Sequence, residues 1–112
     1  MDTSFEELKV ITDQVYSIHS MNRIKFHQEI VDLLSRHGIN LRNKNGSNPI
    51  VTISHPTSLP GSMVVGLRYT KLDGTKTEDH FLFQANVKIE KCYGKRLERL
   101  FHEYSGAHKL QR

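Results

Sequence analysis

From Met63 to Phe83 the sequence reads MVVGLRYTKLDGTKTEDHFLF, and this stretch decides the fold. Asp73-Gly74 is a turn signal between two runs of alternating apolar and polar residues, a pattern typical of a β-hairpin. A three-residue loop, Leu72-Asp73-Gly74, places the large apolar residues of both strands on one face. A two-residue loop would scatter them over both faces, so we predict the three-residue loop.

The predicted register pairs apolar residues across the two strands. Val65 lies opposite Phe81, and Arg68 lies opposite Glu78 as an exposed ion pair. The face expected in the core carries Met63, Val65, Leu67, Phe81 and Phe83. The opposite face is left for solvent or a partner, and it carries Arg68, Thr70, Lys76, Glu78, His80 and Gln84.

Two helices are expected before the hairpin, although the sequence leaves open whether they are one bent helix. Ser4 and Glu7 have the spacing of a capping box, which places Ser4 at the N-cap of the first helix. The apolar stripe of this helix is Leu8, Ile11, Val15 and Ile18. The second helix is expected from about Arg23 to His37, with Gly38 as its stop signal. A polar loop, residues 40–49, and a short strand, residues 50–55, come next.

The segment after Gln84 is expected to form the last helix. Its apolar residues recur at intervals of three and four, and they are Ile89, Tyr93, Leu97, Leu100 and Tyr104. The predicted order is therefore α-α-β-β-β-α. Three antiparallel strands with helices on one face make an α+β two-layer sandwich, and 112 residues suit a single domain, residues 1–112.

The net charge of +4 is distributed unevenly along the chain. Residues 86–112 carry seven basic and three acidic side chains, whereas residues 1–40 carry four basic and six acidic ones. A lone cysteine, Cys92, suits a reducing compartment. Neither a signal peptide nor an apolar run of about 18 residues is visible. We therefore expect a cytoplasmic or nuclear protein with no membrane partner.

The candidate site is a line of cations on the predicted last helix. Its members recur at intervals of three and four, and they are Lys88, Lys91, Lys95, Arg99 and His102, with Arg96 beside them. Neighbours in such a row lie about 5–6 Å apart and can contact successive phosphates. The alternative is an ordinary solvated helix face. We expect this line to bind nucleic acid, either RNA or DNA.

The sequence indicates neither a cofactor nor a metal. It contains no glycine-rich phosphate-binding motif, no C-x-x-C and no H-x-x-x-H pair. A ribonuclease-like acid–base set remains an alternative, and its members would be His55, His80, Arg68 and Glu78. Scattered surface histidines are common, and Cys92 is expected in the core. We therefore expect no enzymatic activity.

From the second helix onward, the predicted α-β-β-β-α order is similar to that of double-stranded-RNA-binding domains and of small RNA-binding subunits of the signal recognition particle. The similarity is one of element order, because residues 85–88, Ala-Asn-Val-Lys, do not match the glycine-serine-lysine-lysine pattern of the RNA-binding domains. The leading hypothesis is a small non-catalytic nucleic-acid-binding protein. The alternative is a regulator, inhibitor or adaptor that binds a protein partner, or forms a homodimer, through the exposed sheet face or the N-terminal helix.

Overall fold

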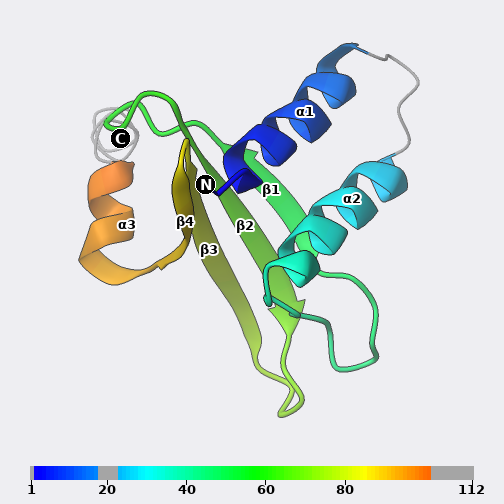
Figure 1. Cartoon of the computed structure of the whole chain (residues 1–112). Helices are drawn as coiled ribbons and strands as arrows, with labels where there is room; N and C mark the ends of the chain where they lie inside the picture. Colours follow the sequence, from blue (N-terminus) through cyan, green and yellow to red (C-terminus); the bar gives the residue numbers. More distant parts are fainter. Residues whose placement is uncertain (1, 18–22, 102–112) are drawn as a thin grey trace.

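The computed structural model describes residues 2–17 and 23–101. Within these residues the chain forms three helices and four strands (Figure 1): α1 Ser4–Ser17, α2 Arg23–Arg36, β1 Ile50–Ser54, β2 Ser62–Thr70, β3 Lys76–Gln84, β4 Val87–Cys92 and α3 Gly94–Leu100. The strands form one antiparallel sheet in the order β1-β2-β3-β4. The general α+β class is confirmed, whereas the three-stranded sheet and the predicted element order are wrong.

The β2–β3 hairpin has the predicted register. Val65 pairs with Phe81, and Arg68 pairs with Glu78. Arg68 Nε lies 3.0 Å from Glu78 Oε1, which is the expected cross-strand ion pair. The loop is closed by the Lys71 N–H, which donates to the Thr75 carbonyl at 2.8 Å. Gly74 has a φ of 88°, in the left-handed region that such a loop requires.

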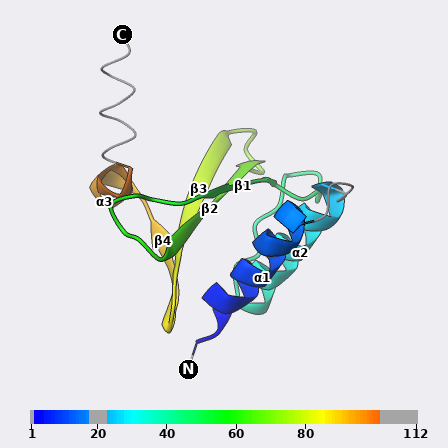
Figure 2. The ribbon, with the colours of Figure 1, turned by 90° about the horizontal axis from the view of Figure 1, so that it is seen from above.

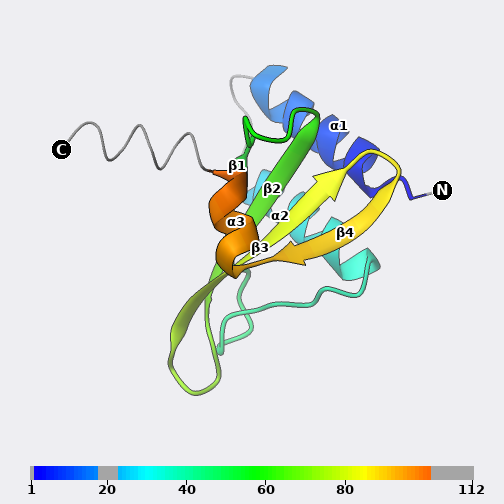
Figure 3. The ribbon, with the colours of Figure 1, turned by 90° about the vertical axis from the view of Figure 1, so that its left-hand side faces the viewer.

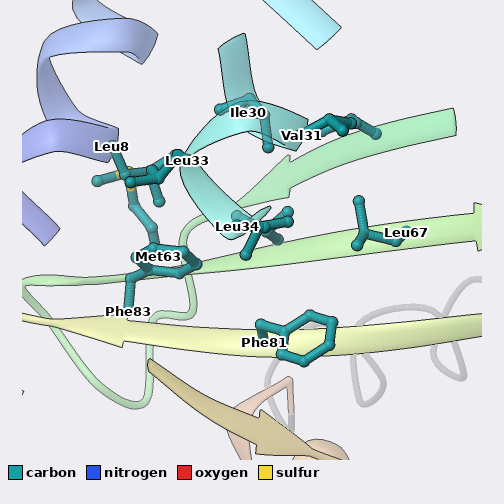
Figure 4. Close-up of a cluster of buried hydrophobic side chains, with 11 residues drawn as sticks. Leu8, Ile30, Val31, Leu33, Leu34, Met63, Leu67, Phe81 and Phe83 are labelled. Carbon is teal, nitrogen blue, oxygen red and sulfur yellow. The ribbon is translucent and has the colours of Figure 1, made fainter. Parts of the chain in front are cut away.

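The main core lies between the α1–α2 pair and one face of the sheet (Figure 4). The five apolar residues predicted to share the buried face of the hairpin are all buried there. The helices contribute Leu8, Ile30, Val31, Leu33 and Leu34. Each large apolar side chain removed from water stabilises the fold by about 1.5–3 kcal/mol. This cluster therefore holds the helical layer on the sheet.

Two separate helices, α1 and α2, pack side by side over the sheet (Figures 1 and 2). The predicted stop of α2 is confirmed, because Gly38 has a φ of 83° and the Ile39 N–H donates to the Leu34 carbonyl at 2.9 Å. Ile18 and Tyr104, which the sequence places in apolar stripes, lie outside the described residues. None of the helices in the described ranges combines the length and the apolarity needed to cross a membrane.

The cap of α1 differs from the predicted one. The helix begins at Ser4, and the Thr3 carbonyl accepts the Glu7 N–H at 3.0 Å, so Thr3 is the N-cap. Asp2 Oδ1 accepts the Ser4 N–H at 2.9 Å. Ser4 Oγ is buried and has no hydrogen-bond partner among the described residues. The side chain that caps this helix is therefore Asp2.

The predicted last helix is wrong over its first half, because Val87–Cys92 form the strand β4. Asn86 has a φ of 61° and turns the chain back after β3, so that Gln84 pairs with Val87. A second turn at Gly94, with a φ of 58°, starts α3. The helical spacing of the apolar residues fits one long helix, but pairing with β3 satisfies the backbone of this segment instead.

The third helix lies on the other face of the sheet, so the prediction of helices on one face is also wrong (Figures 2 and 3). A second cluster packs there, and it consists of Val64, Leu82, Cys92 and Leu100 with Leu59, Leu97 and Phe101 around it. Ser58 Oγ donates to the Leu100 carbonyl at 2.7 Å and ties the β1–β2 connector to this helix. The sheet is therefore covered on both faces over part of its area.

Candidate nucleic-acid interface

The six predicted nucleic-acid-binding residues do not form one line on a helix. Lys88 and Lys91 lie on β4, whereas the other three described members, Lys95, Arg96 and Arg99, lie on α3. His102 falls outside the described residues. Because the chain turns sharply at Gly94, α3 packs on the face of the sheet opposite to α1 and α2. The predicted row of cations is therefore divided between two elements.

On β4, Lys91 is held near an acidic neighbour. It lies opposite Phe81 in the sheet, and its Nζ is 3.8 Å from Asp79 Oδ2. The same carboxylate oxygen accepts a hydrogen bond from the Tyr69 hydroxyl at 2.8 Å. The contact between Lys91 and Asp79 is long and half-exposed, so the ammonium remains able to contact a ligand.

On α3, one arginine is engaged and two cations are open. Arg96 contacts Glu90 at 3.2 Å through both Nε and a terminal nitrogen, which is a two-point ion pair. Lys95 and Arg99 are exposed and have no ion pair within the described residues. They stand four residues apart, which places them next to each other on the helix surface.

Tyr93 differs most from its predicted environment. The sequence pattern places it in a buried helical stripe, but it is the extended N-cap of α3 and is 73% exposed. Lys91 precedes it by two residues and Lys95 comes two residues after it. Because the segment was interpreted as one long helix, the exposure of this aromatic ring, which lies between two lysines in the sequence, was not predicted. Gly94, directly after Tyr93, was the one sign in this segment that the predicted helix could be interrupted. Glycine readily adopts positive φ and is common where a regular element ends.

The alternative acid–base set is assembled only in part. Glu78 accepts from Arg68 at 3.0 Å and lies 2.9 Å from His80 Nε2. His55 is exposed and makes no hydrogen bond or ion pair with the residues that the structure describes. These contacts form an ion-pair cluster on the sheet, with Glu78 between a cation and an imidazole.

Cys92 is buried, as predicted, and burial raises the pKa of its thiol. A raised pKa keeps the sulfur protonated and weakly nucleophilic at neutral pH. Across residues 2–17 and 23–101, no three His, Cys, Asp or Glu side chains are grouped so that they could hold a metal ion. The burial and the raised pKa of its thiol indicate that Cys92 is a packed residue of the core.

The Tyr69–Asp79 hydrogen bond leads to a prediction about pH. Burial, together with the Asp79 carboxylate, raises the pKa of Tyr69 from 10.0 to about 12. The stabilisation from this neutral phenol is complete below pH 10 and is lost as the pH rises toward 12. In an absorbance titration of the phenolates, the last transition should disappear in Tyr69→Phe and persist in Tyr93→Phe. A last transition that survives in Tyr69→Phe would contradict this assignment.

Comparisons with protein-family models, with curated proteins and with solved structures find no match to this chain. The similarity in element order to double-stranded-RNA-binding domains also ends, because β4 comes after β3 where the last helix was expected. Any function must therefore be inferred from the side chains of the chain itself.

Proposed function

We propose that this protein binds single-stranded nucleic acid without catalysis, through a surface made of Tyr93, Lys95 and Arg99, here named the Tyr93 corner. The observation that carries the proposal is the 73% exposure of Tyr93 at the start of α3, a helix on which Lys95 and Arg99 are exposed and have no carboxylate partner among the described residues. Tyrosine joins an aromatic ring to a polar hydroxyl group, so an exposed tyrosine can stack on a ligand while its hydroxyl stays in water.

Stacking supports a single-stranded ligand. Bases in a single strand can leave their neighbours and lie on an exposed aromatic ring, and one such contact is worth about 1–3 kcal/mol. Bases in a duplex present only their edges. Tyr93 is therefore suited to an unpaired base, whichever sugar the strand carries.

The charge of the surrounding segment supports contact with phosphates. Residues 86–101 carry five cationic and two acidic side chains, and one of these acids, Glu90, is already paired with Arg96. Lys95 and Arg99 on α3 have no ion pair within the described residues. Each phosphate that they neutralise releases counterions, so the affinity should fall as salt rises.

The test is an anisotropy titration of labelled single-stranded and duplex oligonucleotides at several salt concentrations. Tyr93→Ala should weaken single-strand binding about 5- to 100-fold, because one stacking contact is lost. Lys95→Gln with Arg99→Gln should reduce the slope of log K against log salt by about 1.4. The oligonucleotide should be recovered intact, since the protein is proposed to be non-catalytic.

The matched control is Lys71→Gln with Lys76→Gln. It removes the same charge from exposed residues at the β2–β3 loop end, away from the Tyr93 corner. Binding that weakens equally in both double variants would indicate a general charge effect and would contradict the proposed surface. Absence of binding to any strand at low salt by the folded protein would contradict nucleic-acid binding itself.

A second candidate, binding of a protein partner or a second copy of the chain, is favoured by one specific observation. Ile50 is 54% exposed on β1, an edge strand, on the face that also carries Arg68. An edge strand offers unpaired backbone groups to an added strand. Ile50→Lys should abolish any concentration-dependent association seen by sedimentation, without affecting nucleic-acid binding.

A further inference from the structure

An open depression of about 470 Å³ lies between the C-terminal end of α2 and β4, on the α1–α2 side of the sheet. Its apolar lining is Ile39, Phe81 and Ile89. Phe81 belongs to the main core, and Ile39 and Ile89 pack against that core while remaining partly exposed. The turn at Gly38 carries Ile39 into this position. Depressions of this volume are of the size that small organic ligands occupy.

Basic side chains line the same depression. Lys88, Lys91 and His37 all contribute to its wall, and among the described residues its one acidic lining residue is Asp2. His37 Nε2 lies 3.6 Å from Glu7 Oε2, and Lys91 is 3.8 Å from Asp79, so two of the three basic side chains already have an acidic neighbour. Lys88 has no ion pair within the described residues.

Asp2 places a carboxylate of the chain itself at the edge of the depression. Its side chain caps α1 through the Ser4 N–H. The pKa of Asp2 is lowered mainly by hydrogen bonding from Ser4, and Lys88 adds a smaller electrostatic contribution. An anion bound in the depression would therefore share the ammonium group of Lys88 with the Asp2 carboxylate.

We propose that this depression binds a small organic anion, a phosphate or carboxylate attached to a flat apolar body. The anionic group contacts Lys88 and Lys91, and the apolar body lies on Ile39 and Ile89 above Phe81. The site is separate from the stacking contact at Tyr93 and does not depend on nucleic-acid binding. Asp2 limits the affinity because it places a like charge beside the ligand.

The test follows backbone amide shifts by NMR while phenyl phosphate is added to the folded protein. Phenyl phosphate should bind with a dissociation constant of about 1 mM, as expected for a ligand of this size. The shifts should gather at residues 37–39, 81 and 88–91. Inorganic phosphate and benzyl alcohol, which supply the anion and the apolar body separately, should each bind more weakly.

Single substitutions measure how each charged side chain of the depression affects the affinity for phenyl phosphate. Lys88→Gln should weaken phenyl phosphate binding about threefold to tenfold, because one charged contact is lost. Asp2→Asn should tighten binding about twofold to threefold, because a like charge is removed. Lys76→Gln, an exposed lysine on β3 outside the depression, is the matched control and should leave the affinity unchanged.

Three results would overturn the proposal. The first is an absence of shifts, and the second is a set of shifts scattered over the whole surface. The third is equal affinity for inorganic phosphate and phenyl phosphate, since the apolar lining would then contribute nothing. Tyr93→Ala distinguishes this proposal from the proposed nucleic-acid binding. The variant should weaken oligonucleotide binding and leave phenyl phosphate binding unchanged.

Discussion

Replacing Phe83 by alanine is expected to lower the free energy of unfolding by about 3–5 kcal/mol. Phe83 has no exposed surface, pairs with Met63 across the hairpin and lies in the cluster shared by the sheet and the helices (Figure 4). Truncation removes a large apolar side chain and leaves a cavity that the packed neighbours fill only in part. Small domains have a total stability of about 5–15 kcal/mol, so the variant should unfold at much lower denaturant concentration.

Leu72→Ala is the matched control for Phe83→Ala. Leu72 is also a large apolar residue of the hairpin, but it is 89% exposed in the loop. Its truncation should change the stability by no more than about 0.5 kcal/mol. Urea denaturation monitored by circular dichroism measures both variants. Similar losses for the two variants would mean that Phe83 does not hold the core.

The second large effect is expected at Gly66, where strands approach closely. A Cβ at this position would lie 2.5 Å from Thr52 Oγ1 and 3.3 Å from His80 Cδ2. Thr52 and His80 are the cross-strand partners of Gly66 on its two sides. Gly66→Ala should therefore cost about 1–3 kcal/mol of stability, because the neighbouring side chains must move.

A double-mutant cycle tests this steric explanation. Thr52→Ala removes the hydroxyl that the new methyl group would meet, so Gly66→Ala should cost much less in that background. A coupling of about 1 kcal/mol or more between the two positions is expected. The lower conformational entropy of alanine in the unfolded chain favours the double variant further, by about 0.4–1 kcal/mol. If Gly66→Ala costs the same in both backgrounds, Thr52 is not the obstacle.

Local patterns determined the central hairpin. The alternation of Met63, Val65 and Leu67, together with Asp73-Gly74, specifies both the face and the loop, because a shift by one residue would expose the apolar set. The end of α2 at Gly38 was determined in the same way, since the stop signal lies within a few residues of the bonds that it makes. The ion pair of Arg68 with Glu78 resulted from the register alone.

The tertiary structure decided the conformation of the segment after Gln84. Ile89, Leu97 and Leu100 have a spacing that suits one helix. Once β3 is available for pairing, Ile89 fits equally well in a strand, and Leu97 and Leu100 fit in a shorter helix that follows it. Strand pairing joins residues that are separated in the sequence, so a local sequence pattern does not show which residues will pair. The free edge of β3 therefore converts the first half of the predicted helix into β4.

The division of the basic residues is a consequence of that same pairing. Lys88 and Lys91 stay with β4, whereas Lys95 and Arg99 continue with the chain through Gly94 to the other face. That turn also brings Leu100 onto Val64 and Leu82, and it leaves Tyr93 exposed. The sequence by itself determined the hairpin, its buried face and the concentration of positive charge near the C-terminus. Only the tertiary structure decided which cations lie together, because their positions depend on a strand pairing and a turn that place neighbours in sequence on opposite faces of the sheet.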